Sequence, residues 1–262
     1  MTVFAPLCSG SSGNCTYLGT KSQGILIDAG ASAKAILATL AEIGIDGRSA
    51  VKAILITHDH NDHIRGLRVL TKRLRVPVYS TVETLEGILD TVGLSPGAET
   101  VELSSRMEIA GMEVTPVDTP HDVAHSVGFR IKAGERTIGY ATDLGEVTPD
   151  IWQGLSGADL VLLESNYEPR LLDISSYPYY LRRRIASDHG HLSNPDCADT
   201  VRRLALSGTA RFVLAHLSLE NNTPELARGA ALSALAEEGM EEGRDFLLTV
   251  ANRLIPTGPI LF

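Results

Sequence analysis

The chain has 262 residues, of which 44% are hydrophobic and 21% charged, which is ordinary for a soluble globular protein. Its formal net charge of −9 argues against a protein that binds nucleic acid over its whole surface, because phosphate binding relies on Lys and Arg. A nuclease is not excluded, since metal ions and a local basic patch can supply positive charge at the reacting phosphate.

Composition also bears on the cellular compartment. No stretch approaches the roughly 18 uninterrupted apolar residues of a membrane span, and the N-terminal segment lacks the basic and apolar regions of an export signal. The cysteines, Cys8, Cys15 and Cys197, are odd in number and form no CxxC pair, so we expect reduced thiols. These features predict a cytoplasmic protein that does not engage a membrane.

The first part of the chain alternates short strands with helices. Strands at 16–19 and 24–28 are predicted to form a hairpin across a polar turn. Apolar residues at helical spacing predict a helix over 36–43, and the continuous run AILIT predicts a buried strand over 53–57. The polar segment HDHND separates this strand from a second amphipathic helix over 64–74.

The rest of the chain continues the alternation without an internal repeat or linker. Further strands are expected at 76–80, 113–117, 127–131, 137–141, 160–164 and 213–215. Further helices are expected at 196–206 and 224–238. Because strands and helices interleave but hairpins are included, we expect an α/β fold with two mixed sheets packed face to face and helices outside both. We expect one domain over residues 1–262.

The distribution of histidine is the strongest signal in the sequence. None of the eight histidines falls inside a helix assigned to core packing, and each lies near a predicted strand end or in a polar loop, where sites are usually built. They are His58, His60, His63, His121, His125, His189, His191 and His216.

The segment THDHNDH, from Thr57 to His63, joins a buried strand to a helix. His58 and His60 are two residues apart in extended chain, so both can point the same way and chelate one ion. Asp62 and His63 follow as the helix begins and can face a neighbouring ion. Imidazole with carboxylate suits Zn²⁺, Mn²⁺ or Fe²⁺ rather than Ca²⁺ or Mg²⁺. A histidine-rich surface loop is the alternative, but so many ligands between a strand and a helix favour a metal site.

HDHNDH resembles the HxHxDH motif of the metallo-β-lactamase superfamily, whose fold is an αββα sandwich. Asp28, at the end of GILID, is similar to the buried acid that orients the superfamily's metal loop. The resemblance implies two divalent ions, Zn²⁺ or Mn²⁺ with Fe²⁺ as a further candidate. The implied ligands are His58, His60 and His121 for the first ion, Asp62, His63 and His216 for the second, and Asp143 shared between them.

Taken singly, each of the later matches is also compatible with a purely structural role. Asp28 and Asp143 are also typical of turn acids, and His216 of a hydrogen-bonded buried histidine. His121, in TPHD, has a rival in His125, which we expect to support the site from outside the ligand set. The order of the matches and their positions at strand ends favour the ligand assignment for all of them.

Three features favour phosphodiester cleavage. Asp62 separates the motif from those of β-lactamases and diiron oxidoreductases. The segment DHGHLSN around His191 resembles the histidine loop of RNase Z-like phosphodiesterases. The segments LCSGSSGN, LESNYE and LAHLSLENN resemble the YycJ/WalJ family of bacterial metallohydrolases, which implies a 5′ exonuclease acting on DNA, single-stranded or at 5′ ends. Asn166-Tyr167-Glu168 departs from the acidic-Asn-His pattern expected after the LLE strand, which leaves any role of that position in doubt.

Asp62 and His191 are the candidate catalytic residues. The expected mechanism uses a hydroxide shared by the two metals, which attacks phosphorus in line. Asp62 orients this nucleophile, and His191 protonates or stabilises the leaving oxygen. His191 has an alternative role as a cap of the following helix, and Ser193 and Asn194 are also strong N-terminal cappers.

Several other residues carry two interpretations. Arg182 to Arg184 could seat flanking phosphates or form a solvated helix face, whereas Arg65, Arg68, Lys72 and Arg73 are more typical of a surface. Tyr177, Tyr179 and Tyr180 could stack on bases, although packing is the commoner reason for such residues. The loop SGSSGN at 9–14 could cradle a phosphate with its backbone N–H groups, but Gly/Ser loops are common.

Two other functions compete with the nuclease. The same metals could hydrolyse a small thioester, lactone or lactam, which the acidic net charge favours and the GHLSN loop opposes. A metal-stabilised binding protein without catalysis is the third interpretation, and the intact ligand set argues against it.

Overall fold

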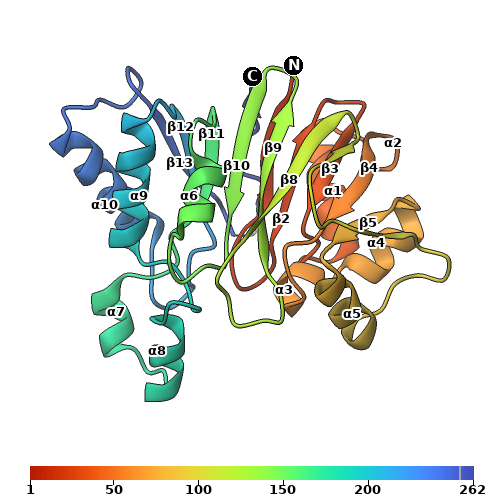
Figure 1. Cartoon of the computed structure of the whole chain (residues 1–262), viewed down its shortest axis with the longest axis horizontal. Coiled ribbons are helices and arrows are strands. Elements are labelled where there is room, and N and C mark those ends of the chain that lie inside the picture. Colours follow the sequence, from red (N-terminus) through yellow and green to blue (C-terminus); the bar gives the residue numbers. More distant parts are fainter. Residues whose placement is uncertain (254) are drawn as a thin grey trace. The chain divides into compact units, whose positions relative to one another are not determined.

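The computed structural model describes residues 1–253 and 255–262. The chain divides into two compact units: unit 1 contains residues 1–116, 123–127 and 252–262, and unit 2 contains residues 117–122 and 128–251. The strands form two seven-stranded sheets, each with parallel and antiparallel pairs (Figure 1). The prediction of a single domain over residues 1–262 stays a prediction.

The first sheet lies within unit 1. In spatial order its strands are β14 (Ile260–Leu261), β1 (Val3–Cys8), β2 (Cys15–Gly19), β3 (Gly24–Ile27), β4 (Val51–Leu55), β5 (Val78–Ser80) and β6 (Thr100–Glu102). Its helices are α1 (Ala33–Glu42), α2 (Gly47–Ala50), α3 (Asn61–Ile64), α4 (Leu67–Leu74) and α5 (Val82–Thr91).

The second sheet has the spatial order β13 (Leu247–Val250), β12 (Arg211–Ala215), β11 (Leu160–Glu164), β10 (Arg136–Ala141), β9 (Val127–Ala133), β8 (Met112–Asp118) and β7 (Met107–Ile109). The helices of unit 2 are α6 (Pro149–Leu155), α7 (Pro169–Ile174), α8 (Tyr179–Ile185), α9 (Asn194–Leu206) and α10 (Pro224–Glu237). No helix in the described part of the chain is long and apolar enough to cross a membrane.

Amphipathic helices cover the first sheet. α1 begins at Ser32, whose hydroxyl accepts a hydrogen bond from the Ala35 N–H group, and it contributes the buried Ile36 to the core of unit 1. α4 places Leu67 and Leu70 in the same apolar cluster as the strand residues of β4. Burial of these apolar faces positions both helices beside the strand ends.

The parallel strands of each unit decide where its polar loops meet. In unit 1, β3, β4, β5 and β6 run parallel, and in unit 2, β10, β11, β12 and β13 do the same. Carboxyl ends of parallel strands share one edge of a sheet, which is where α/β proteins usually bind ligands. The residues directly after these strands therefore converge within each unit.

Most of the predicted elements are present. The predicted hairpin corresponds to β2 and β3, and the helices expected at 36–43 and 64–74 correspond to α1 and α4. The structure adds several elements that the sequence did not predict, namely β1, α2, α3, α5, β6, β7, α6, α7, α8, β13 and β14. The three cysteines are free and buried, in agreement with the expected reduced thiols.

Candidate metal site

In unit 1 the histidine-rich loop follows β4, and its side chains gather at the strand end. His58 and His63 are buried, with their ring centroids 4.1 Å apart, and the ring centroids of His58 and His60 are 4.8 Å apart. An Asp62 carboxylate oxygen lies 3.6 Å from Nε2 of His63. Unit 1 therefore presents three imidazoles and one carboxylate in one small volume, a donor set that suits a transition metal.

Asp28 orients this loop from behind. Its carboxylate is fully buried, accepts a hydrogen bond of 2.9 Å from the Thr57 N–H group and lies 2.8 Å from Nδ1 of His63. With its proton on Nδ1, His63 donates to Asp28 and keeps the lone pair of Nε2 available for a metal ion or for the Asn14 amide nitrogen, which lies 3.0 Å away. The role predicted for Asp28 is the role that these contacts support.

The N-terminal loop with the sequence SGSSGN also contacts the metal loop. The Asn14 side-chain amide donates to a carboxylate oxygen of Asp62 over 3.3 Å, and the Asn14 backbone N–H group donates to the Asp62 carbonyl over 2.8 Å. At Gly30 any Cβ would lie 1.5 Å from the same carbonyl oxygen, so only glycine allows this approach. The SGSSGN loop, for which the sequence also allows a phosphate-binding role, thus positions Asp62.

In unit 2 three acidic or imidazole residues stand at neighbouring strand ends. Asp143 follows β10, Glu164 ends β11 and His216 follows β12. Nδ1 of His216 lies 2.7 Å from a Glu164 oxygen and 3.3 Å from an Asp143 oxygen. Together with His191, these residues bring one ligand atom each within 4.8 Å of one another, which is the spacing of a group able to hold an ion.

Glu164 is a further candidate site residue, which the sequence analysis does not identify. Its buried carboxylate lies 2.9 Å from Nδ1 of His191 and also accepts hydrogen bonds from the backbone N–H groups of Leu144 and Leu192. Burial raises the pKa of Glu164, but the neighbouring His191 charge and the hydrogen bonds from His191 and His216 outweigh it and lower this pKa. An acid at the end of a buried strand, as at Asp28, was the signal that could have identified it.

His191 is partly buried, and its pKa is shifted by the neighbouring carboxylates of Glu164 and Asp143. Burial lowers its pKa, whereas the charge of Glu164, the hydrogen bond to Glu164 and the charge of Asp143 raise it by more. The net effect is a raised pKa, so the imidazolium form persists to higher pH than in a free histidine. This property suits the proton donor that the sequence analysis expected at His191.

His121 belongs to the same group of side chains in unit 2. Its Nδ1 atom donates to the Gly190 carbonyl over 3.0 Å, and its Nε2 atom lies 3.8 Å from an Asp143 oxygen. Burial lowers the pKa of His121 despite the nearby Asp143 charge, which favours the neutral imidazole, the form that a metal ligand needs. The hydrogen bond from Nδ1 to Gly190 orients Nε2 toward Asp143.

The remaining candidates lie elsewhere. Nδ1 of His125 lies 3.1 Å from a carboxylate oxygen of Glu83, an exposed residue, and His189 is exposed on the loop before His191. Neither belongs to a potential metal group among the described residues. In the arginine triplet, Arg184 pairs with Asp122 and Arg182 donates to a backbone carbonyl. Ser193 caps α9, as the sequence suggested.

Comparison with known proteins agrees with these features. A family model described as a beta-lactamase superfamily domain matches residues 23–217, about three quarters of the chain. The exodeoxyribonuclease YycJ of Bacillus anthracis is 34% identical over 258 residues, which covers 97% of this chain and 97% of that relative. The exodeoxyribonuclease WalJ of Streptococcus pneumoniae serotype 2 is 34% identical over 247 residues, covering 93% of this chain and 91% of the relative.

The fold matches as well. The metallo-beta-lactamase fold protein YhfI from Bacillus subtilis superposes with a TM-score of 0.71 at 14% identity, covering 98% of this chain and 99% of that structure. The expected fold class, with two mixed sheets and associated helices, is confirmed. The chain therefore belongs to the metallo-β-lactamase superfamily and, within it, to the family that includes YycJ and WalJ.

Proposed function

We propose that this protein is a dinuclear metal-dependent exonuclease that hydrolyses DNA from 5′ ends, with single strands as its substrate, in the cytoplasm. The observation that carries the proposal is the buried Glu164 carboxylate, which bonds both His191 and His216. It couples a proton donor to a candidate metal ligand, an arrangement that suits protonation of a sugar oxygen as it leaves phosphorus. The names of the relatives, exodeoxyribonucleases at 34% identity over nearly the whole chain, support the substrate class.

The proposed ligand assignment follows the superfamily motif. His58, His60 and His121 hold the first ion, Asp62, His63 and His216 hold the second, and Asp143 is shared. The donor sets described within each unit fit Zn²⁺ or Mn²⁺, and they also suit Fe²⁺. When bound, two such ions neutralise phosphate oxygens and lower the pKa of the attacking water.

Asp62 and His191 carry out the proton chemistry. Asp62, held by the Asn14 amide, accepts a hydrogen bond from the attacking water and orients it toward phosphorus. The His191 Nδ1–H group remains bonded to Glu164, so Nε2 is the atom that donates a proton to the leaving sugar oxygen. The Glu164 carboxylate stabilises the imidazolium before transfer and fixes the ring orientation.

A substrate panel tests this function. Protein purified without chelators is incubated with Mn²⁺ and 5′-phosphorylated single-stranded DNA, a 3′-blocked copy, a thioester and a chromogenic lactam. We expect progressive shortening of both single-stranded DNA substrates from the 5′ end and no turnover of the thioester or the lactam. Turnover of the thioester or lactam with intact DNA would establish the small-molecule hydrolase that the acidic net charge favours. Bound metal without any turnover would indicate a binding protein.

A further inference from the structure

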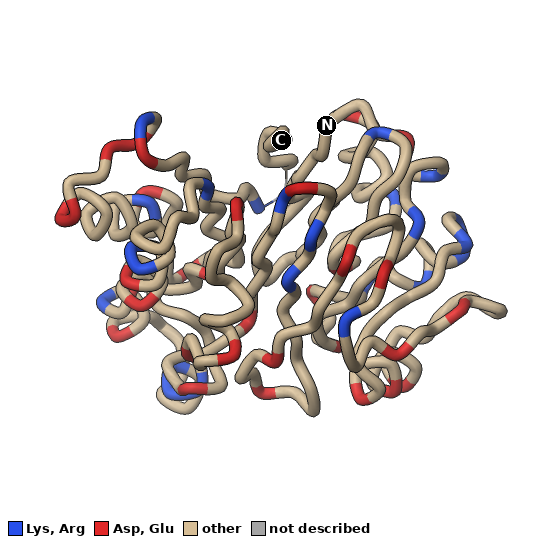
Figure 2. Tube along the Cα trace, turned by 45° about the horizontal axis from the view of Figure 1, so that its top comes forward, with Lys and Arg blue, Asp and Glu red and all other residues tan. Residues whose placement is uncertain are grey.

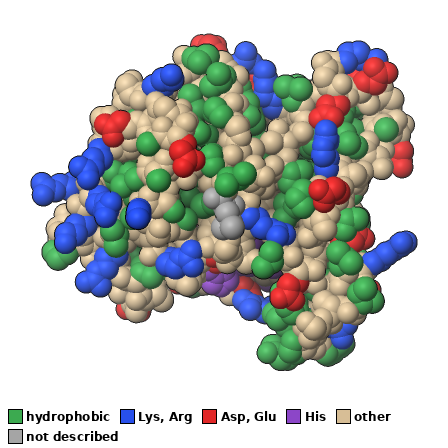
Figure 3. Space-filling view, turned by 180° about the vertical axis from the view of Figure 1, so that it is seen from behind, with side chains coloured by type: hydrophobic (Ala, Val, Ile, Leu, Met, Phe, Trp, Pro, Cys, Tyr) green, Lys and Arg blue, Asp and Glu red, His purple; other side chains and the backbone are tan. Residues whose placement is uncertain are grey.

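Charged residues of both signs are interspersed along the trace of each unit (Figure 2), in keeping with a chain of net charge −9. α4 departs from this pattern, because its sequence LRVLTKRL contains basic residues and no acid. Lys and Arg side chains also gather along the left edge of the face shown in Figure 3, which corresponds to the side of unit 1 where Figure 1 places α2 and α4.

Two of the three basic residues of α4, Arg68 and Lys72, share one face of the helix. Leu67, Leu70 and Leu74 are buried, whereas Arg68 and Lys72, one helical turn apart, are exposed. Arg75 caps the C-terminal end of α4 with left-handed backbone and lines the same cavity as these two residues. Arg65, in the turn before α4, instead donates a hydrogen bond to the Ser12 carbonyl and lines a different cavity.

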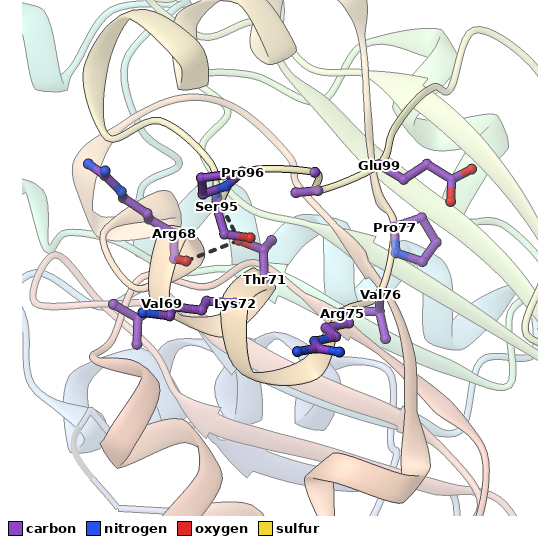
Figure 4. A pocket seen from close by; sticks show the side chains of 12 residues that line it. Arg68, Val69, Thr71, Lys72, Arg75, Val76, Pro77, Ser95, Pro96 and Glu99 are labelled. Carbon is purple, nitrogen blue, oxygen red and sulfur yellow. Dashed lines mark hydrogen bonds between the residues drawn. The ribbon is translucent and has the colours of Figure 1, made fainter.

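This face lines a cavity of about 710 Å³ between α4 and the segment before β6 (Figure 4). Arg68, Lys72 and Arg75 contribute three cationic groups, and none of them takes part in an ion pair within the described part of the chain. The only acid in the lining of this cavity is Glu99. The excess of positive charge therefore faces open solvent, where it attracts an anion.

The opposite wall of the cavity is fixed and partly apolar. The Ser95 N–H group donates to the Thr71 hydroxyl over 3.3 Å, which holds the loop against α4 (Figure 4). Pro77 and Pro96 add rigid apolar surface to the lining. Cations beside apolar surface match the chemistry of a nucleotide, whose phosphate is charged and whose base is flat and weakly polar.

We propose that Arg68, Lys72 and Arg75 form a basic track that binds the phosphate backbone of the single DNA strand leaving the metal loop. This inference rests on the proposed nuclease function. The track begins at Arg68, five residues after His63, and ends at Arg75, and all three of its residues line the cavity. Seven residue steps along a helix span about 10 Å, which at roughly 3.4 Å per stacked nucleotide accommodates about three nucleotides.

The test removes the charges of the track within the cavity and retains the metal loop. The track variant is Arg68→Gln, Lys72→Gln, Arg75→Asn, with Asn chosen because the backbone of residue 75 is left-handed, at φ 55°. The control variant, Lys21→Gln, Arg106→Gln, Lys132→Gln, removes the same number of exposed positive charges elsewhere. Both are compared with the parent protein by fluorescence anisotropy on a 12-nucleotide single strand and by hydrolysis of that strand and of a 5′-phosphorylated dinucleotide.

The track variant is expected to bind the 12-mer on the order of 10- to 100-fold more weakly, with the slope of log K against log salt reduced by about 2. Its KM for the 12-mer should rise, while kcat and dinucleotide hydrolysis remain at the parent level. Equal affinity and salt slope in the track variant and the control would overturn the track while leaving the nuclease intact. Failure of the parent protein to cleave either DNA would instead reject the proposed function.

Discussion

Asp28, Asp143 and His216 share an uncommon backbone conformation. Their φ angles are 63°, 58° and 55°, in the left-handed region that residues other than glycine rarely adopt. Each follows the end of a buried parallel strand, where the chain must turn sharply while presenting a side chain at the sheet edge. Strain of this kind persists where the surrounding contacts hold it, and it concentrates at functional sites.

His191 and His189 allow a matched pair of substitutions. His191→Ala should reduce kcat on DNA about 10²- to 10⁴-fold, because the leaving oxygen loses its proton donor, while metal content stays unchanged. His189→Ala should match the parent protein, since His189 is exposed on the same loop. Steady-state kinetics and elemental analysis check both outcomes. Parent-level turnover by His191→Ala would refute the role assigned to this residue.

The substitution Glu164→Gln tests the electrostatic coupling between Glu164 and His191, because it removes the charge of residue 164 but keeps a side chain of similar size. Because the Glu164 charge and hydrogen bond raise the pKa of His191, the neutral amide should lower that pKa. A general acid loses activity as pH rises through its pKa, so the alkaline limb of the kcat profile should move to lower pH. The pH–kcat profile with saturating metal is the measurement. An unshifted alkaline limb would show that Glu164 acts only on packing.

At the scale of elements, Gly30 holds the loop after β3 against the metal loop. Gly30→Ala should lower the free energy of unfolding by about 1–3 kcal/mol, because the added methyl group overlaps the Asp62 carbonyl. Gly229→Ala on α10 is the control, because nothing lies within 4 Å of its Cβ position, and it should stabilise by about 0.5–1 kcal/mol. Urea denaturation measures both. Equal stability of the two variants would contradict the close approach at Gly30.

Elements with strong periodicity could be predicted, and those fixed by distant contacts could not. Continuous apolar runs predict the buried strands β4 and β11, and apolar residues at helical spacing predict the amphipathic helix α4. β1 contains Pro6 and was not recognised, and α8 buries none of its residues and so lacks an apolar face. β14 has only two residues.

The site residues also divide into those that a local sequence motif predicts and those that only distant contacts bring together. The residues of the HDHNDH loop are adjacent in sequence, so their motif was readable. Asn14 meets Asp62 across 48 positions, and Glu164 meets His216 across 52. Contacts of that range depend on strand order, which no local pattern encodes.

For the whole molecule, we expect metal binding to increase the stability of the folded protein. The buried acids and imidazoles at the two sheet edges lose their proposed counter-charge when metal is removed. We expect chelation to lower the stability of the protein by about 2.7 kcal/mol relative to metal at 100 times its Kd, and Zn²⁺ or Mn²⁺ to restore it. Thermal unfolding with and without chelator measures the change. An identical Tm in both conditions would argue against metal in the folded protein.

We propose that two bound ions enable this chain to shorten DNA from its 5′ end. The most direct measurement is a titration of metal-free protein with Zn²⁺ or Mn²⁺, in which product lengths from 3′-labelled, 5′-phosphorylated single-stranded DNA are followed at each metal load. We expect stepwise shortening from the 5′ end that reaches its full rate at two equivalents of metal per chain. DNA that remains at full length at every metal load would contradict it.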